Sequence, residues 1–169
     1  MKKLIVLLMA LVLVMPIFAH AATTLVVTGD ERIVGLSGEP EIRKITYLLT
    51  YDATPTALTN IALCDIPIAD GTKTCDRSQQ YQIGGWWLLQ VDYDYNTTQP
   101  TLDTDLRIWS INDRIDILGG TGENAIDTGV AISIFPANVS RPLTGDELFD
   151  VSNNAVASAT ADFVIWLYK

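Results

Sequence analysis

The sequence contains one histidine, His20, and it falls within an N-terminal segment that we expect to be removed. A mature chain without histidine excludes Ser-His-Asp and Cys-His catalysis, and it excludes histidine-ligated zinc, copper and iron sites. No P-loop or Rossmann glycine motif is present either. We therefore expect a protein that is not an enzyme. A hydrolase built on carboxylates alone remains the enzymatic alternative, although no particular acidic residue is indicated.

Only one long apolar run occurs, at the start of the chain. Lys2 and Lys3 precede apolar residues 4–14, and Ala19-His20-Ala21 places small residues where a signal peptidase requires them. These features predict a signal peptide over residues 1–21 and an exported protein that is periplasmic, cell-surface or extracellular. An uncleaved anchor is the alternative. No later stretch is long and apolar enough to cross a bilayer, so no membrane attachment is expected after cleavage.

Basic residues are few. Removal of residues 1–21 leaves nine Lys and Arg against twenty Asp and Glu, which changes the formal charge from −9 to −11. Nucleic acids and anionic membranes attract basic patches, so we expect neither as a partner. The remaining residues, 22–169, fit one domain that is large enough to bury a core.

Cysteine occurs only twice, at Cys64 and Cys75. An even, small number of cysteines in an exported chain predicts one disulfide. The spacing is wider than the C-x-x-C pattern of a redox pair, so the role is structural. The loop that it closes is short, and the chain-entropy model gives a stabilisation of roughly 3 kcal/mol.

Polar and apolar residues alternate along stretches rich in Thr, Val, Ile and aromatic residues, which is typical of β-strands. The clearest stretches are residues 43–51, 86–95 and 161–168, and turn residues such as Gly29-Asp30 separate shorter ones. Helical periodicity is missing, although Thr144 and Glu147 suit a capping box over one short helical turn. We predict one all-β domain, a jelly-roll or immunoglobulin-like β-sandwich of about 8–10 strands with little helix.

Four aromatic residues are candidates for a ligand-binding platform: Trp86, Trp87, Tyr93 and Tyr95. Strict alternation places Trp87, Tyr93 and Tyr95 on one face of a strand and Trp86 on the other. One tryptophan is therefore expected in the core and the other at the surface, where it would suit a sugar. Packing in the core is the alternative for most of these rings.

Carboxylates cluster in the same part of the chain, and Asp92, Asp94, Asp103 and Asp105 are candidate calcium ligands. Solvated strand faces and turns are the alternative. Residues 119–127 match one copy of a calcium-binding nonapeptide repeat, with Asn124 in place of Asp. Such repeats bind calcium between stacked copies, so a single copy indicates a glycine-rich turn. Calcium is the one cofactor that the sequence suggests.

Several motifs in the second half of the chain follow a common outline. They are residues 103–108, residues 116–124 with the pattern Asp-Ile-Leu-Gly-Gly-x-Gly-x-Asn, and the late stretches 148–154 and 164–168. In this outline the chain resembles small β-rich proteins encoded among tailed-phage structural genes. The resemblance implies a virion-type β-sandwich with a role in assembly or surface display, and it brings no catalytic residues. The signal peptide departs from that group, because phage capsid and tail parts assemble in the cytoplasm.

These features together predict an exported, non-enzymatic structural or surface-interaction protein that self-associates or binds a cell-surface protein. The alternative is a secreted carbohydrate-binding module, assisted by calcium, whose partner is a glycan.

Overall fold

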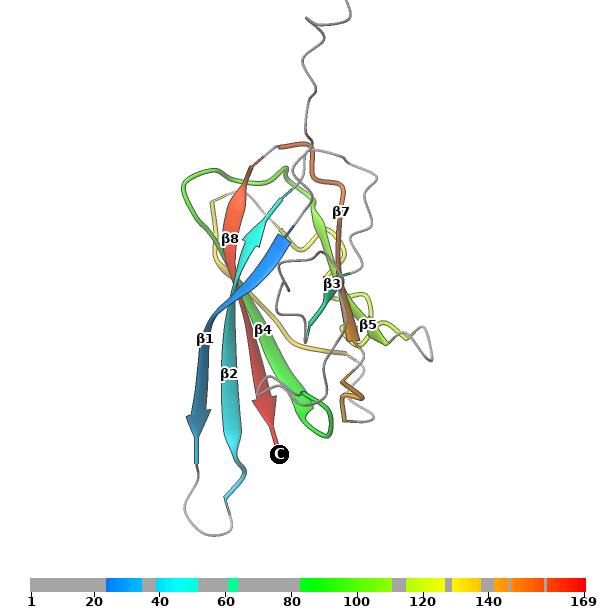
Figure 1. Ribbon diagram of the computed structural model, residues 1–169. Helices are drawn as coiled ribbons and strands as arrows, with labels where there is room; N and C mark the ends of the chain where they lie inside the picture. The colour runs from blue at the N-terminus through cyan, green and yellow to red at the C-terminus, as the bar shows by residue number, and fades with distance from the viewer. Residues whose placement is uncertain are drawn as a thin grey trace, which may run out of the picture.

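The computed structural model describes residues 24–34, 39–51, 61–63, 83–110, 115–126, 129–137, 142–145, 147–156 and 158–169. These residues contain no helix and eight strands, namely β1 (Thr24–Ile33), β2 (Ile42–Thr50), β3 (Ile61–Ala62), β4 (Trp87–Tyr95), β5 (Asp105–Ser110), β6 (Ile132–Ile134), β7 (Glu147–Ser152) and β8 (Thr160–Tyr168). All strand pairs are antiparallel. They form a five-stranded sheet, β1-β2-β8-β4-β6, and a three-stranded sheet, β3-β7-β5. The two sheets lie face to face (Figure 1), which confirms the predicted all-β sandwich.

The core lies between the two sheets. Every second residue of β2 is buried, as expected when one face of a strand turns inward. The rings of Phe149 on β7 and Phe163 on β8 have centroids 4.4 Å apart, so they join the sheets directly. The Tyr47 hydroxyl on β2 donates a hydrogen bond of 2.9 Å to the Leu63 carbonyl beside β3. Aromatic contacts and a buried hydrogen bond therefore fix the spacing of the layers.

Gly29 and Asp30 do not form the predicted turn. β1 runs through both residues and pairs with β2 along its whole length, with a bulge between Val27 and Gly29. The Asp30 carboxylate accepts two hydrogen bonds of 2.9 Å from the guanidinium of Arg43, which is fully buried on β2. Pairing with a long neighbouring strand and a bidentate ion pair outweigh the local turn preference of a Gly-Asp dipeptide.

The contact expected between Thr144 and Glu147 forms, but the helical turn does not. Glu147 is fully buried and begins β7. Its carboxylate accepts hydrogen bonds from the Thr144 backbone N–H at 2.5 Å, the Thr144 hydroxyl at 2.9 Å and the Gly145 N–H at 2.8 Å. Gly145 has a φ of 93°, which turns the chain directly into a strand. The carboxylate therefore closes a turn at the start of β7.

Residues 1–21, together with Cys64 and Cys75, lie outside the described residues. The signal peptide and the disulfide stay predictions. Among the described residues, no helix has the length and apolar character needed to cross a bilayer.

Candidate functional site

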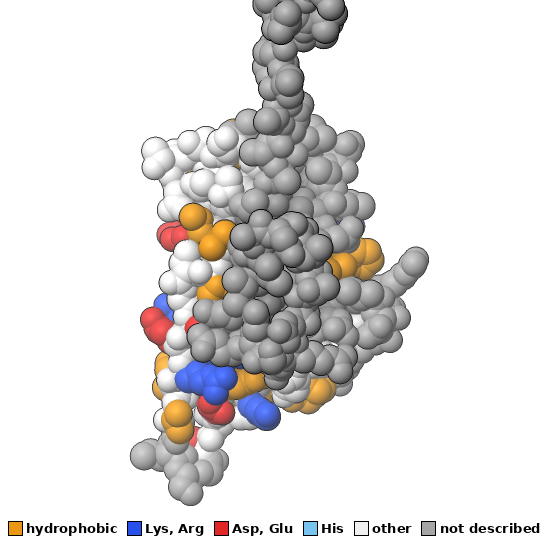
Figure 2. Space-filling model, in the orientation of Figure 1, with side chains coloured by type: hydrophobic (Ala, Val, Ile, Leu, Met, Phe, Trp, Pro, Cys, Tyr) orange, Lys and Arg blue, Asp and Glu red, His pale blue; other side chains and the backbone are white. Residues whose placement is uncertain are grey.

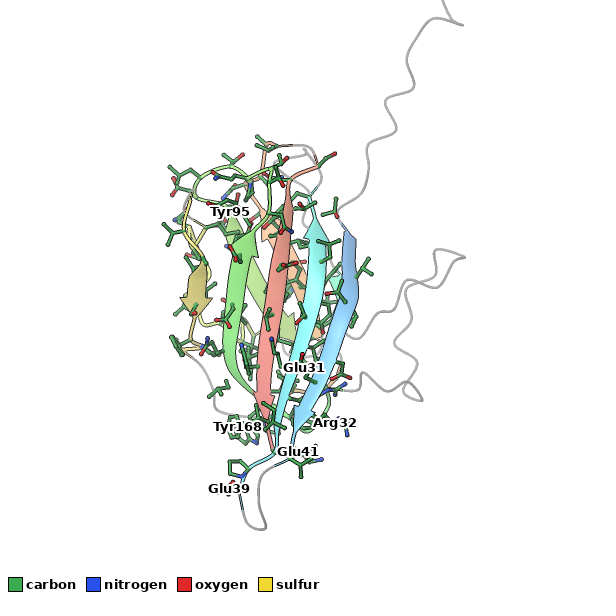
Figure 3. The ribbon with its side chains drawn as sticks, turned by 90° about the vertical axis from the view of Figure 1, so that its left-hand side faces the viewer. Glu31, Arg32, Glu39, Glu41, Tyr95 and Tyr168 are labelled. Carbon is green, nitrogen blue, oxygen red and sulfur yellow. The ribbon has the colours of Figure 1, made fainter. Side chains whose placement is uncertain are left out.

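Aromatic side chains gather on the outer face of the five-stranded sheet, which Figure 3 views directly. Trp87 on β4 and Tyr168 at the end of β8 lie opposite each other on neighbouring strands. Their buried neighbours Leu88 and Leu167 point into the core, so both aromatic side chains point away from it. The two ring centroids are 6.2 Å apart and the planes are inclined by 25°. The two rings therefore stack against each other on the outer face of the sheet.

Trp166, two residues before Tyr168, belongs to the same face and is held by Asp92 on β4. The indole Nε1–H of Trp166 donates a hydrogen bond of 2.6 Å to Asp92 Oδ2. Asp92 Oδ1 accepts hydrogen bonds from the Ser133 hydroxyl at 2.7 Å and from the Gln90 amide. The Lys44 ammonium lies 5.4 Å from the centroid of the Trp166 ring, within cation–π range. We call Lys44, Trp87, Gln90, Asp92, Ser133, Trp166 and Tyr168 the aromatic face.

The same contacts determine the charge of Asp92. Partial burial disfavours its ionised form, but hydrogen bonds from Ser133, Gln90 and Trp166 and the positive charge of Lys44 outweigh that effect. The pKa of Asp92 is therefore lowered below its ordinary value. The ionised carboxylate accepts hydrogen bonds from side chains on β4, β6 and β8. These bonds keep the surrounding side chains in one arrangement.

A bulge in β4 decides which face Trp87 occupies. The pairing of β4 with β8 shifts between Leu88 and Gln90, so Leu89 is an extra residue and is 44% exposed. An inserted residue moves the side chains that precede it to the opposite faces of the strand. The prediction that Trp87 shares a face with Tyr93 and Tyr95 is therefore wrong. The bulge instead brings Trp87 onto the face of Gln90 and Asp92.

The other three predicted platform residues, Trp86, Tyr93 and Tyr95, lie in the core or pack against it. Trp86 is only 5% exposed, and the cationic groups of Arg32, Arg43 and Lys169 lie 5.8–6.0 Å from its ring centroid. Tyr93 is buried and accepts a hydrogen bond of 3.1 Å from the Tyr51 hydroxyl. Burial raises the pKa of Tyr93 to about 12. Tyr95 is half-buried against the core. The expected division between a buried and a more exposed tryptophan thus applies to Trp86 and Trp87.

The four candidate calcium ligands are divided between the sheets. Asp92 and Asp94 lie on β4, whereas Asp105 begins β5 in the other sheet and Asp103 precedes it with a φ of 62°. In the described part of the chain, no group of three or more His, Cys, Asp or Glu residues could hold a metal ion. The proximity of these carboxylates in the sequence therefore does not bring all four together.

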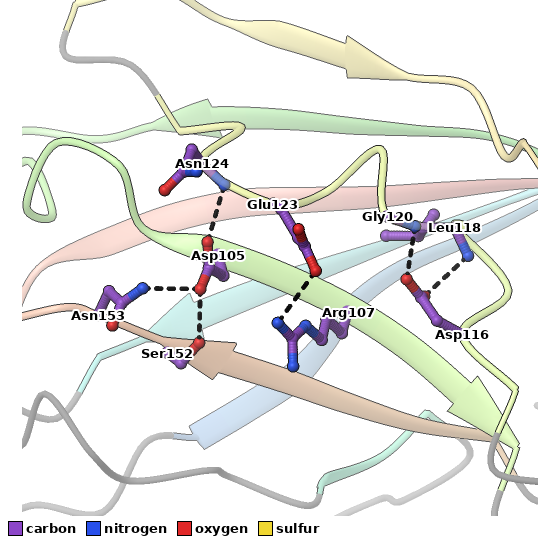
Figure 4. A network of polar contacts seen from close by, with 9 residues as sticks. All are labelled: Asp105, Arg107, Asp116, Leu118, Gly120, Glu123, Asn124, Ser152 and Asn153. Carbon is purple, nitrogen blue, oxygen red and sulfur yellow. Dashed lines mark hydrogen bonds and ion pairs between the residues drawn. The ribbon is translucent and has the colours of Figure 1, made fainter.

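Asp105 instead holds local structure together, as Figure 4 shows. It is buried, and it accepts hydrogen bonds from the Asn124 backbone N–H at 2.8 Å, the Ser152 hydroxyl at 3.0 Å and the Asn153 amide at 2.7 Å. These donors come from β7, from the residue after it and from the loop that follows β5. Asp105 joins all three segments.

The nonapeptide match forms a glycine-rich turn next to Asp105. Asp116 accepts hydrogen bonds from the backbone N–H groups of Leu118 at 3.0 Å and Gly120 at 2.7 Å (Figure 4). Gly122 lies so close to β5 that a Cβ atom would be 2.0 Å from the Leu106 carbonyl oxygen. The glycines of the motif and the preceding Asp116 thus have structural roles in the turn.

A second unusual carboxyl group lies on the outer side of the three-stranded sheet. Asp150 is 3% exposed, and burial raises its pKa to about 6. The Trp109 indole N–H and the positive charge of Arg107 act in the opposite sense with smaller effect. Asp150 Oδ1 and Trp109 Nε1 are both buried without a well-formed hydrogen bond. Asp150 is therefore a group whose charge changes at mildly acidic pH.

Sequence reasoning missed most of the aromatic face. Alternation in residues 160–168 does place Trp166 and Tyr168 on the face opposite Phe163, but their neighbours depend on the strand order. No sequence signal indicated that β8 lies between β2 and β4, which brings Lys44 and Trp87 beside it. Comparison with models of known protein families, with curated protein sequences and with solved structures returned no match.

Proposed function

We propose that the protein is an exported, non-enzymatic surface-interaction β-sandwich that binds its partner through the aromatic face. The observation that carries the proposal is the convergence of Trp87, Trp166 and Tyr168 on the side of the sheet away from the core. Aromatic side chains are enriched in binding surfaces, where they provide a large contact area and most of the binding energy. The core has its own aromatic residues, so these three have no evident role in joining the sheets.

The arrangement of the face favours binding because it is fixed in advance. Asp92 holds the Trp166 indole, and Lys44 lies over the same ring. Trp87 and Tyr168 pack beside each other across two strands. Side chains that are already ordered lose less conformational entropy when a partner binds, so more of the contact energy contributes to affinity.

The edges of the five-stranded sheet are poorly suited to strand addition. β1 contains a bulge and three successive charged residues, Asp30, Glu31 and Arg32. Figure 2 shows acidic and basic side chains next to each other on the lower part of the described surface, where Figure 1 places the end of β1. β6, at the other edge, has three residues. Bulges, charges and short edge strands all oppose pairing with another chain. Self-association, which the resemblance to phage structural proteins suggests, would therefore not proceed by strand addition at β1 or β6.

The contacts of three carboxylates, Asp92, Asp105 and Glu147, support a non-enzymatic role. Asp105 and Glu147 each accept three hydrogen bonds from their own chain, as expected of groups that hold turns and strands in place. Asp92 likewise accepts from three neighbouring side chains. Carboxylates with such contacts have a structural role, because they hold neighbouring segments together.

The test compares variants of the aromatic face with a matched surface variant. The protein is produced from the full chain, its mass is measured by light scattering over a wide concentration range, with and without calcium, and binding of labelled protein to the producing cells is quantified. We expect an oligomer or cell binding, either of which Trp87→Ala weakens. Leu102→Ala, which removes another exposed apolar side chain, serves as the control. A monomer that binds no cell, or equal behaviour of both variants, would contradict the proposal.

A carbohydrate-binding module is the second candidate function. The observation that favours it is the pair formed by Trp87 and Tyr168, whose rings are inclined by only 25° and lie beside polar side chains. Calcium assistance belongs to this candidate, and the light-scattering and binding measurements with and without calcium include it.

A further inference from the structure

We infer that the partner of the aromatic face is an uncharged carbohydrate, with a sugar ring packed on Trp87 and Tyr168. This inference rests on the proposed function, because it names the class of ligand for the same surface. The three steps of the argument concern the shape of the aromatic surface, the polar groups beside it and the charge of its surroundings.

The shape of the ring pair suits a pyranose. Trp87 and Tyr168 come from adjacent antiparallel strands, and their centroids are 6.2 Å apart with little inclination. A pyranose ring presents C–H groups on its faces and hydroxyl groups around its rim. The face of an aromatic ring is apolar and carries partial negative charge, so it attracts these C–H groups. The two rings are stacked, and a sugar ring packed on the outer face of either ring would continue the stack.

Polar groups lie farther along the same face, around Trp166, where hydroxyl groups of a bound oligosaccharide would meet them. Asp92 uses three of the roughly four acceptor sites of a carboxylate, which leaves one for a hydroxyl group. The Gln90 side-chain nitrogen donates to Asp92, so the carbonyl oxygen of the same amide can accept from a ligand. Lys44 supplies ammonium donors above Trp166. Aromatic faces beside fixed donors and acceptors match a ligand that is apolar on its faces and polar at its rim.

Charge argues against the main competing partners. The chain has a formal charge of −9, and within the described strands this sheet face carries Asp92, Asp94 and Asp162 but one basic residue, Lys44. A second copy docking face to face would bring these carboxylates toward their equivalents, and an acidic polymer would be repelled. An uncharged oligosaccharide adds no charge. It therefore avoids this repulsion while it covers the rings.

The test uses the protein produced from its full chain and a panel of uncharged polysaccharides: cellulose, chitin, mannan and β-1,3-glucan. Depletion from solution is measured for each polysaccharide, and soluble fragments of a retained polysaccharide are added as competitors. We expect retention on at least one of them. Trp87→Ala and Tyr168→Ala should each lower the affinity about tenfold or more, because the loss of an aromatic contact of about 1.4 kcal/mol corresponds to that factor. Leu102→Ala should bind as the wild type does.

Circular dichroism and thermal unfolding check that each variant is folded. Retention of the wild type on none of the polysaccharides would overturn the inference, as would retention of both ring variants equal to that of the wild type. If Trp87→Ala abolishes self-association or cell binding while no polysaccharide is retained, the carbohydrate fails and the proposed function survives. If Trp87→Ala changes neither polysaccharide retention nor self-association nor cell binding, the carbohydrate ligand and the proposed function both fail.

Discussion

Asp94 on β4 lies directly opposite Asp162 on β8, so two exposed carboxylates face each other across neighbouring strands. Like charges at opposed positions of an antiparallel pair destabilise a sheet. We expect Asp162→Asn, which keeps the size of the side chain, to raise the free energy of unfolding by about 0.5 kcal/mol. Chemical denaturation of the two proteins measures the difference.

Salt provides the control for this pair. The difference between wild type and Asp162→Asn should become smaller in 1 M salt, because screening weakens the repulsion between exposed charges. A calcium-induced stabilisation that the variant lacks would instead show that Asp94 and Asp162 bind the ion together. That outcome would contradict the interpretation of the pair as an uncompensated repulsion.

Asp150 should make stability depend on pH. Its pKa is raised by burial from 3.8 to about 6 in the folded protein, so the protonated carboxyl group is the form that the fold favours. Stability from this group is fully present below about pH 4, and it is lost as the pH rises through about 6. The loss is on the order of 3 kcal/mol at most, since each pKa unit corresponds to about 1.4 kcal/mol.

Urea denaturation between pH 4 and pH 8 measures this dependence. We expect Asp150→Asn, which cannot ionise, to remove the decline in stability between pH 4 and pH 7. Asp162→Asn is the control, because Asp162 is exposed on the other sheet and its replacement should leave the decline in place. An unchanged pH profile in Asp150→Asn would show that another group causes it.

The sequence was sufficient for the sandwich because alternation depends only on local residues. The stretch that begins at Arg43 alternates without interruption, and β2 buries the residues that this pattern assigned to one face. The same reasoning failed at Trp87, because the bulge at Leu89 inverted the alternation. A bulge depends on the partner strand, and no residue pattern within β4 identified β8 as that partner.

The candidate site was less predictable than the fold for a related reason. Trp166 and Asp92 are far apart in the sequence, and they meet only because β8 lies between β2 and β4. Asp105 was predicted as a candidate calcium ligand, but its three hydrogen-bond donors were not foreseeable. Residue type indicated which groups carry chemistry, and tertiary pairing decided which of them meet.

The ion pair between Asp30 and Arg43 should contribute strongly to stability when only one partner is removed. Arg43 is fully buried and Asp30 binds it through two hydrogen bonds of 2.9 Å. Asp30→Ala removes a carboxylate that binds a buried guanidinium through two hydrogen bonds, and breaking a buried ion pair typically costs about 3–5 kcal/mol. The double variant Asp30→Ala/Arg43→Met should lose less than the sum of the single variants, because the interaction between the two side chains is then lost only once. Denaturation of all four proteins measures the coupling, and additive losses would contradict it.

Gly122 should be the least replaceable glycine of the turn after β5. A Cβ atom at this position would lie 2.0 Å from the Leu106 carbonyl oxygen, and backbone atoms cannot move away without displacing β5. We expect Gly122→Ala to destabilise the protein by at least about 2 kcal/mol, as for an overpacked site. Gly120→Ala is the matched control, because its Cβ meets no atom within 4 Å and only its φ of 83° opposes alanine.

The left-handed conformation at Gly120 costs alanine about 1 kcal/mol, so the two variants separate a steric clash from backbone strain. Chemical denaturation compares them, and the exchange of the Leu106 amide, which donates a hydrogen bond of 2.8 Å to the Gly122 carbonyl, reports on the contact itself. Faster exchange of that amide in Gly122→Ala than in Gly120→Ala is expected. Equal losses of stability in the two variants would mean that the close approach to β5 does not constrain the turn, and that both glycines serve only its backbone conformation.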